Sequence, residues 1–579
     1  MPGQLYNPQS VPATPRIGWR DILIFLAFFG LLLGVSNLTK GMRAPLSVSK
    51  PMEISLSPLA LPGYAARSLL RMFIAFGFSI LFTLVYGYIA AYNKRAQKIL
   101  VPLLDILQSV PVLGFLSVTV TGFMALFPGS IMGLECASIF AIFTGQAWNM
   151  TFSFYQSLRN IPEELREAAT VYQLTWWQRF VRLEVPYSMI GLVWNGMMSF
   201  GGGWFFLAAS EAISVLDNNF KLPGIGSYMA TAVEKGDSAG VVYAIVTMIA
   251  IVILVDQLFW RPIVAWSQKF KFEQTESGQE QTSPVLDIIR ASALLPILNQ
   301  RLFMPLSRTL DAFFASGKRA ARRTPLPSVF RKAMNFIFSS VLLGAIGYGI
   351  WRGIVVVHSE FTWRSGLYVT FLGFLTLLRV LIMVVVATVI WTPIGVKIGF
   401  TPRLARIAQP LVQIGASFPA NLIFPLVVLV FIKLNINFEW GSILLIALGT
   451  QWYILFNVIA GASAVPGDLR EAAVVFRLRN WTLWRTLILP AIFPAWVTGA
   501  LTAAGGAWNA SIVAEVASWG THMPLKAHGL GAYVADATKT GDWPQIIVGI
   551  AIMSLYVVLL NRLVWKPLYY LAETRYRLG

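Results

Sequence analysis

Two short segments of the chain repeat one another closely, and they contain residue types through which a soluble partner can recognise a helix. Residues 162–174 read PEELREAATVYQL and residues 466–478 read PGDLREAAVVFRL, with eight of the thirteen positions identical. Each segment places a proline at the predicted first helical position, acidic side chains in the first turn and paired alanines after them. The pattern predicts two short helices in water that present the same face twice, which suits two copies of one soluble subunit.

The predicted contact face follows from helical spacing. Every third or fourth residue returns to the same side of a helix. In the first segment this stripe contains Leu165, Ala169 and Tyr172, and in the second it contains Leu469, Ala473 and Phe476. The candidate coupling residues are the two LREAA pentapeptides: Leu165, Arg166, Glu167, Ala168 and Ala169, and Leu469, Arg470, Glu471, Ala472 and Ala473.

Four charged residues stand in apolar surroundings, where ionisable groups are costly and mark a pathway or a structural pair. Arg71 and Arg379 occupy equivalent positions near the predicted outer ends of two helices. They either snorkel to the interface or attract an anion, because a guanidinium group suits planar oxyanions. Glu211 and Glu515 each follow a tryptophan by seven residues. For these acids a structural role competes with gating and with proton-linked transport.

Four tryptophans complete the candidate translocation path, and helix packing or interfacial anchoring is the alternative for each of them. They are Trp148, Trp204, Trp452 and Trp508.

Several kinds of chemistry are absent from the sequence. One cysteine, Cys136, cannot form an internal disulfide, and three scattered histidines predict no metal site. No G-x-x-x-x-G-K-[ST] phosphate loop occurs in the sequence. ATP and magnesium are therefore expected to bind to another polypeptide, and this chain is expected to hold no cofactor. The net charge of +19 comes from basic residues that cluster in short loops between apolar stretches, as in membrane proteins. A nucleic-acid partner is therefore not expected.

The elements that position these residues are membrane-spanning helices. Hydrophobic residues make up 56% of the 579 positions and charged residues 12%, so the lipid bilayer is the expected solvent. Apolar stretches of spanning length form two sets of six, about twelve helices in total. They lie near 18–38, 68–92, 101–127, 131–155, 186–213 and 240–260, and near 334–357, 366–393, 408–432, 440–461, 490–515 and 545–565.

The two sets are copies of each other. Arg71 corresponds to Arg379 at an offset of 308, and Trp148 corresponds to Trp452 at an offset of 304. An even number of helices in each copy predicts a parallel repeat about an axis along the membrane normal, with the pathway between the halves. The predicted domains are 1–260 and 333–579, joined by a cytoplasmic linker at 261–332 that is partly amphipathic. The excess of Lys and Arg in alternate loops places both termini in the cytoplasm.

The repeated segments resemble a known family. LREAA, followed by a basic aromatic stretch and by LEVP at 183–186 or LILP at 487–490, is similar to the EAA loop of bacterial ABC-importer permeases. The flanking GGGWFFLAASEAIS and LPGIGSYMATAVEKGD, with AGGAWNASIVAEVAS and GLGAYVADATKTGD in the second copy, resemble the nitrate/sulfonate/taurine/bicarbonate branch. The EAA loops would occupy residues 156–185 and 462–489.

The resemblance implies a fold, partners and a location. It implies two tandem six-helix type I permease domains in a bacterial inner membrane, working by alternating access with two ATPase subunits and an extracytoplasmic solute-binding protein. The cargo would be a small anion. Family loops carry a glycine where this chain has Gln173 and Arg477, so the short helices are expected to continue there. A secondary transporter of twelve helices driven by an ion gradient is the alternative, but it leaves the paired LREAA loops unexplained.

Overall fold

The computed structural model describes residues 53–576 apart from 110, 216–217, 271–282, 520–524 and most of 293–362, together with scattered residues of 18–39. Contacts along the chain separate two compact units. One consists of residues 1–41, 156–194 and 254–341, and the other of residues 42–155, 195–253 and 342–579. The domain boundaries predicted at 260 and 333 stay a prediction.

The first unit is helical where the structure describes it. It contains the first predicted short helix, α6 (Glu163–Val171), then α7 (Trp176–Arg179) and the π turn η3 (Phe180–Glu184). Later come the π turn η4 (Asp256–Trp260), α11 (Arg261–Ser267), the 3-10 turn η5 (Gln268–Phe270) and α12 (Pro284–Arg290). Most of the predicted linker at 261–332 lies outside the described residues.

The second unit contains helices from both copies. The first copy contributes η1 (Pro58–Ala60), α2 (Leu61–Tyr92), α3 (Lys94–Ser109), η2 (Val112–Phe115), α4 (Leu116–Leu126) and α9 (Ile225–Glu234). Three helices cross from one unit into the other: α5 (Met132–Arg159), α8 (Val185–Glu211) and α10 (Ser238–Val255).

The second copy lies within this same unit from residue 363 onward. Its elements in order are α16 (Trp363–Gly399), α17 (Pro402–Ser417), η7 (Ala420–Leu422), α18 (Phe424–Leu434), α19 (Phe438–Ser463), α20 (Gly467–Val475), α21 (Asn480–Leu483), η8 (Trp484–Ile488), α22 (Leu489–Ala514), α23 (Leu530–Thr540), α24 (Trp543–Leu560), η9 (Asn561–Trp565) and α25 (Lys566–Arg575).

The prediction of an all-α polytopic membrane protein is confirmed. Six continuous helical segments of the described chain are long and apolar enough to cross a membrane. They are Pro58–Tyr92, Ser238–Phe270, Trp363–Gly399, Phe438–Ser463, Asn480–Ala514 and Trp543–Arg575. The spans predicted near 18–38 and 334–357 lie mostly outside the described residues.

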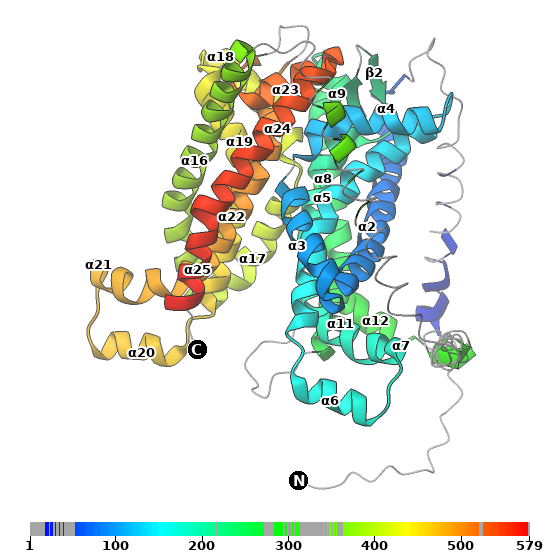
Figure 1. Ribbon diagram of the computed structural model, residues 1–579, viewed down its shortest axis with the longest axis vertical. Coiled ribbons are helices and arrows are strands. Elements are labelled where there is room, and N and C mark those ends of the chain that lie inside the picture. The colour runs from blue at the N-terminus through cyan, green and yellow to red at the C-terminus, as the bar shows by residue number, and fades with distance from the viewer. Residues whose placement is uncertain are drawn as a thin grey trace. The chain divides into compact units, whose positions relative to one another are not determined.

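Small residues set the packing of the second copy, in which α16, α19 and α22 run beside one another (Figure 1). A Cβ atom at Gly399 of α16 would lie 2.7 Å from the carbonyl oxygen of Ile459 in α19, so these backbones touch. At Gly461 the same atom would lie 2.6 Å from the Ala495 side chain of α22. Close approach through glycine and alanine is the usual basis of helix association in lipid, because burial of apolar side chains contributes little to association there.

Two departures from ideal helix recur in both copies. A short antiparallel hairpin follows the end of α8 and of α22: β1 (Ala212–Val215) pairs with β2 (Asn218–Lys221), and β3 (Val516–Ala517) with β4 (Leu525–Lys526). The π turns η3 and η8 start 304 residues apart, and η4 and η9 start 305 apart. Apolar periodicity predicts neither feature, because a short hairpin after a helix and a single π turn are too local to change the pattern.

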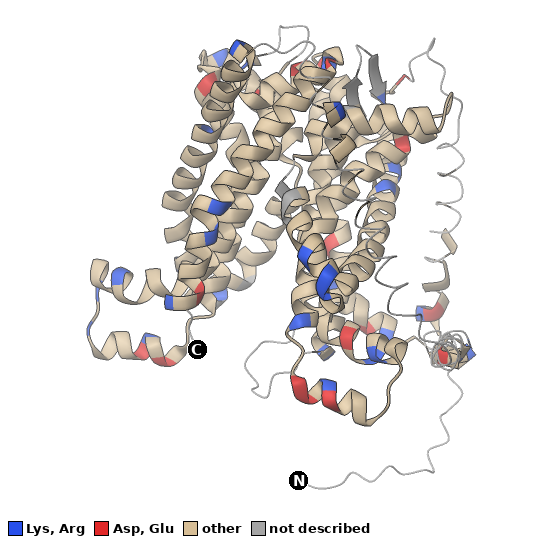
Figure 2. Cartoon of the chain, viewed as in Figure 1, with Lys and Arg blue, Asp and Glu red and all other residues tan. Residues whose placement is uncertain are grey.

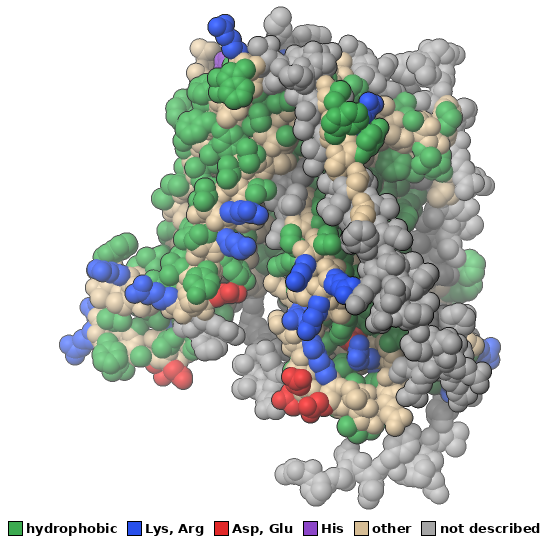
Figure 3. Space-filling model, in the orientation of Figure 1, with side chains coloured by type: hydrophobic (Ala, Val, Ile, Leu, Met, Phe, Trp, Pro, Cys, Tyr) green, Lys and Arg blue, Asp and Glu red, His purple; other side chains and the backbone are tan. Residues whose placement is uncertain are grey.

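Side-chain chemistry along the helices matches a lipid environment. Acidic residues are visible on both α6 and α20, whereas the long apolar helices carry their charges mainly toward their ends (Figure 2). Hydrophobic side chains cover the visible outer face of α16 (Figure 3). Exposed hydrophobic residues of α16 include Leu367, Phe371, Val385 and Val389, each of which is more than half exposed.

Candidate functional site

The two predicted short helices exist, and each begins one residue after its proline. Pro162 is the N-cap of α6 and Pro466 is the N-cap of α20, with backbone φ and ψ of −53° and 145°, and of −55° and 143°. The prolines therefore precede the helices rather than forming their first residues. Acidic residues of the first turn, Glu163 and Glu164 in α6 and Asp468 in α20, face the partial positive charge of the N-terminus.

The arginine of each LREAA segment fastens its short helix to the helix before it. Arg166 Nη2 donates to the carbonyl oxygen of Leu158, 2.8 Å away in the last turn of α5. Arg470 Nη2 donates at the same distance to the carbonyl oxygen of Ala462 in the last turn of α19. Carbonyls in the last turn of a helix lack the usual partner four residues on, so a charged donor stabilises them and fixes the position of the loop.

The second alanine of each motif faces inward, and the glutamate faces water. Ala169 and Ala473 are buried, whereas Glu167 and Glu471 are exposed. At the C-terminal end of the predicted contact stripe the side chains are exposed: Tyr172 is 79% exposed and Phe476 is 75% exposed. Each belongs to an exposed apolar patch at the end of its own helix. The patch of α6 contains Val171 and Tyr172, and the patch of α20 contains Val474, Val475 and Phe476.

The short helices end at the position where the family carries glycine, which corrects the expectation that they continue. Gln173 and Arg477 have φ of 50° and 51°, in the left-handed region that non-glycine residues rarely adopt. Leu174 N donates to the carbonyl oxygen of Ala169 at 3.0 Å, and Gln173 N donates to that of Thr170 at 3.0 Å. The same pair of bonds closes α20 and is the usual glycine-terminated ending of a helix.

Glycine at either position should stabilise the protein. The left-handed conformation costs a non-glycine residue about 1 kcal/mol, and glycine adopts it without that cost. Gln173→Gly and Arg477→Gly should therefore each raise the unfolding temperature in detergent. Gln156→Gly is the matched control, because it changes an exposed residue inside α5 and should lower that temperature. An unfolding temperature for Gln173→Gly at or below that of the wild type would contradict the strain.

Arg71 is fully buried and paired with two carboxylates, so the snorkelling interpretation is wrong for it. Its Nε lies 2.5 Å from Glu135 Oε2 and its Nη2 lies 2.7 Å from Glu135 Oε1, a two-pronged pairing. Its Nη1 donates to Glu211 Oε1 at 2.7 Å and to the carbonyl oxygen of Pro223 at 3.0 Å. Such planar, paired bonding is specific to the guanidinium group.

The glutamate in this cluster holds the start of α9. Glu211 Oε2 accepts a hydrogen bond from Gly226 N at 2.7 Å, and its Oε1 accepts from the hydroxyl of Ser68 at 2.6 Å. The Ser68 oxygen in turn accepts from Ile225 N at 3.1 Å. A Cβ atom at Gly224 would lie 2.2 Å from the Glu211 carboxyl carbon, so only glycine fits beside it. The carboxylate thus satisfies amides at a helix N-terminus.

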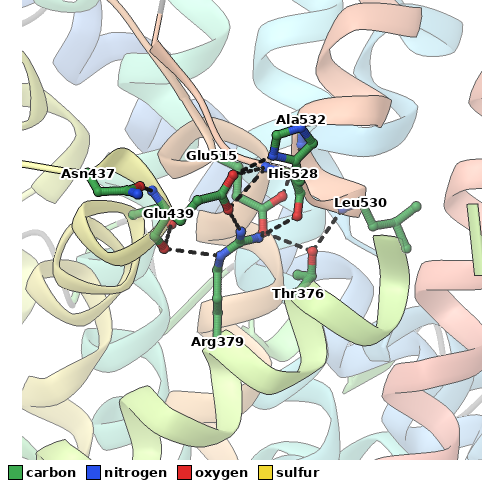
Figure 4. Close-up of polar contacts among 9 residues, drawn as sticks. Thr376, Arg379, Asn437, Glu439, Glu515, His528, Leu530 and Ala532 are labelled. Carbon is green, nitrogen blue, oxygen red and sulfur yellow. Dashed lines mark hydrogen bonds and ion pairs between the residues drawn. The ribbon is translucent and has the colours of Figure 1, made fainter. Parts of the chain in front are cut away.

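The second copy builds a similar cluster around Arg379 (Figure 4). Arg379 Nη1 donates to Glu515 Oε1 at 3.0 Å, and its Nη2 pairs with Glu439. Thr376 takes the place of Ser68, and Ala532 N donates to Glu515 Oε2 at 3.1 Å. Where the first copy has Pro223, this copy has His528, whose Nδ1 lies 2.5 Å from Glu439 Oε1.

The two clusters differ in their contact with solvent. The Glu135 side chain is 4% exposed, whereas that of Glu439 is 35% exposed. Sequence reasoning singled out the arginines and the terminal glutamates but missed Glu135 and Glu439. A signal was present, because both are acids in apolar stretches and stand 304 residues apart.

The four candidate tryptophans make packing contacts within their own copies. Trp204 and Trp508 are each 1% exposed. Trp204 lies edge-on to Phe200 and Trp508 stacks on Tyr556, with ring centroids 5.7 and 6.2 Å apart. Trp148 meets Phe82 at 5.7 Å, and Trp452 meets Trp391 at 5.8 Å. A role for them in the translocation path stays a prediction. Among the residues that the structure describes, no group of His, Cys, Asp and Glu could hold a metal ion.

Comparison with known proteins places both copies in one family. The family model described as "Binding-protein-dependent transport system inner membrane component" matches residues 83–259 and 391–565. A nitrate import permease protein of Leptolyngbya laminosa is 26% identical over 33% of this chain and 64% of its own length. A bicarbonate transport system permease protein of Synechococcus elongatus is 28% identical over 31% of this chain and 61% of its own.

A taurine transport system permease protein of Escherichia coli is similar to the same degree, at 26% identity over 32% of this chain and 64% of its own length. Each of these matches spans less than two thirds of the relative. The family match, by contrast, occurs twice and covers more than half of this chain. The chain therefore belongs to the binding-protein-dependent transport system inner membrane components, with two copies of the family domain fused in one polypeptide.

Proposed function

We propose that this chain supplies two fused permease domains of an ATP-driven importer of a small anion. Two separate ATPase subunits would dock on α6 and α20 and bind ATP and magnesium, and a separate solute-binding protein would deliver the cargo. The chain itself would perform no covalent chemistry. The observation that carries the proposal is the repeated short helix, exposed at its glutamate and fastened to the preceding helix by its arginine.

The coupling would be mechanical. A subunit that binds the exposed patch and the glutamate of α6 or α20 pulls on a helix that Arg166 or Arg470 holds against the end of α5 or α19. Movement of the ATPase subunits would thereby reach the membrane helices in both copies at once. Alternating access between the two sides of the membrane would follow as the halves move relative to each other.

The anionic nature of the cargo and the orientation of the chain are parts of the proposal. The relatives named above include permeases for nitrate, bicarbonate and taurine. The excess of basic residues in alternate loops supports cytoplasmic termini in a bacterial inner membrane. A secondary transporter driven by an ion gradient is the alternative, and it would have no use for two docking helices.

Reconstitution distinguishes these functions. The full chain, purified with the ATPase and receptor chains of its source and placed in sealed vesicles, should import labelled anion only when ATP is present on the ATPase side. A protease added on that side should also remove the C-terminus. Uptake that follows an ion gradient in vesicles without any ATPase would establish the secondary transporter instead.

A further inference from the structure

A proline interrupts each copy at the same place, and the short turn after it reaches the other copy. Pro111 is the N-cap of η2 in the first copy, and Pro419 is the N-cap of η7 in the second. The two prolines stand 308 residues apart. We call the segments 111–115 and 419–422 the elbows of the two copies. Proline ends a helix, and the first N–H groups of the turn that follows have no partner within that turn.

The first elbow contacts helices of the second copy. Val112 N donates a hydrogen bond to Asn509 Oδ1 of α22 at 2.8 Å. Two residues further on, a Cβ atom at Gly114 would lie 3.1 Å from the side chain of Ile550 in α24. The elbow and both helices belong to the second compact unit. The asparagine side chain therefore supplies the acceptor that the free backbone amide needs.

The second elbow makes the equivalent contact with the first copy. Asn421 Nδ2 donates to the carbonyl oxygen of Phe205 in α8, 3.3 Å away. One turn earlier on both sides, a Cβ atom at Gly201 would lie 3.3 Å from the Cβ atom of Ser417. Phe205 and Asn509 stand 304 residues apart and occupy equivalent positions. Each elbow contact thus contains one asparagine, and that asparagine bonds to a main-chain group of the other copy.

Both contacts lie near the ends of α8 and α22 that carry the hairpins. Phe205 is six residues before the end of α8, and Asn509 is five residues before the end of α22. At 1.5 Å per residue both lie within about 9 Å of those ends. With the orientation proposed above, this is the extracytoplasmic end. One turn away from it the same side of α22 is open, since no atom of the described chain lies within 4 Å of the position that a Cβ at Gly505 would take.

Asn421 is incompletely paired in this conformation. Its Oδ1 atom is buried and has no hydrogen-bond partner among the residues that the structure describes. An unpaired buried oxygen lowers stability. The fold does not require an asparagine at this place, because the equivalent position of the first elbow holds Leu113. A junction that opens would expose the oxygen to water, so the residue suits a contact that is made and broken.

The type of bond also separates the elbows from the interior of each copy. Arg71 and Arg379 are joined by ion pairs to carboxylates of their own copies. The bonds at the elbows are neutral, and neutral hydrogen bonds are weaker than charge-assisted ones. We propose that the two elbow contacts form a gate between the copies, closed here and opened in each transport cycle, with Asn421 and Asn509 as its positioning residues. The proposal rests on the import function proposed above.

A reversible lock tests whether the gate moves. Gly201→Cys with Ser417→Cys is made in a chain whose own thiol is removed by Cys136→Ser. The two Cβ atoms are then close to the separation of roughly 3.5–4.5 Å that a disulfide spans. The chain is assembled with the ATPase and receptor chains of its source in sealed vesicles. Oxidation should lower the rate of ATP hydrolysis at least about tenfold, and dithiothreitol should restore it, because a bridged gate cannot change state.

A bridge within one copy is the matched control. A Cβ atom at Gly395 of α16 would lie 3.1 Å from the Cβ atom of Val458 in α19. Gly395→Cys with Val458→Cys should therefore bridge on oxidation and leave ATP hydrolysis unchanged. The thiols that remain, counted with a maleimide after denaturation, show how far each bridge has formed. Failure of residues 201 and 417 to bridge would refute the contact, and full hydrolysis by the bridged importer would refute the gate.

Replacement of the two asparagines tests which side chains hold the gate closed. Asn421→Leu with Asn509→Phe gives each position the residue type of the equivalent position in the other copy and removes both hydrogen bonds. Residues 201 and 417 should then bridge at least about fivefold more slowly, because the closed state is less populated. Asn457→Leu is the control, since this half-buried asparagine donates to a carbonyl oxygen of its own helix. An unchanged bridging rate in the double variant would show that the asparagines do not hold the gate.

ATP separates the possible failures. If the copies rock as rigid bodies, movement that draws them together at α6 and α20 parts them at the elbows. A non-hydrolysable ATP analogue should therefore slow the bridging of residues 201 and 417. If the analogue leaves bridging unchanged while uptake still requires ATP, the gate is wrong and the import function stands. If the chain binds no ATPase subunit and its uptake follows an ion gradient, the proposed function is wrong, and with it the inference that rests on it.

Discussion

Replacing Arg71 by Gln should cost more stability than any other single change in the buried clusters. The substitution leaves the carboxylates of Glu135 and Glu211, which are 4% and 0% exposed, without the cation that pairs with both of them. Breaking a buried pair from one side typically costs about 3–5 kcal/mol, because the remaining charge stays buried. The variant should reach the membrane at a much lower level, and its unfolding temperature in detergent should fall.

Three further variants give this expectation its controls. Arg379→Gln should cost less, since Glu439 is partly exposed and keeps its bonds to His528. Arg71→Lys should have an intermediate unfolding temperature, because lysine retains the positive charge but cannot make the two-pronged pairing of a guanidinium group. Adding Glu211→Gln to Arg71→Gln should recover part of the loss by removing one unpaired charge. Equal unfolding temperatures for wild type and Arg71→Gln would show that the cluster does not stabilise the fold.

Reversing the charge of both loop glutamates should abolish transport while leaving the protein folded. Glu167 and Glu471 are exposed, so Arg at these positions disturbs no buried contact. In a docked complex a like charge in place of an attraction costs several kcal/mol, which corresponds to more than about tenfold in affinity. The double variant should therefore lose the ATPase subunits on purification and import nothing.

The single variants and a distant substitution complete the experiment. Glu167→Arg and Glu471→Arg alone should each reduce transport less, because the other copy still docks. Glu53→Arg changes an exposed acid outside both loops and should have no effect. Import at the wild-type rate by the double variant would mean that α6 and α20 do not couple ATP to transport.

The sequence alone was sufficient for the class of protein and for the duplicated plan. Repeated motifs such as LREAA, and the equivalent positions of Arg71 and Arg379, can be recognised directly in the sequence. The length of apolar stretch that a spanning helix needs follows from the thickness of the bilayer. The partners of those residues were not predictable in the same way. Glu135 lies 64 residues from Arg71, and Glu211 lies 140 residues away, and only the fold brings them together.

Residue preferences for local backbone conformation gave a wrong prediction at the ends of the short helices. Glutamine and arginine are poor residues for a left-handed turn, so Gln173 and Arg477 argued for a continuing helix. The turn forms regardless, since its two backbone hydrogen bonds and the following segment hold it in place. By contrast, Tyr172 and Phe476 belong to the predicted contact stripe, and they are exposed at the ends of their helices, where a docking surface has use for them.

The π turns have a consequence for the ancestry of the chain. A π turn contains one residue more than the helix around it requires, and such turns are rare. Here they occupy matching places in both copies, at η3 and η8 and again at η4 and η9. A single-residue insertion at each place in an ancestral half-length protein, before the gene doubled, accounts for all four turns. The shifts in offset from 308 to 304 and then to 305 mark loop changes made after that doubling.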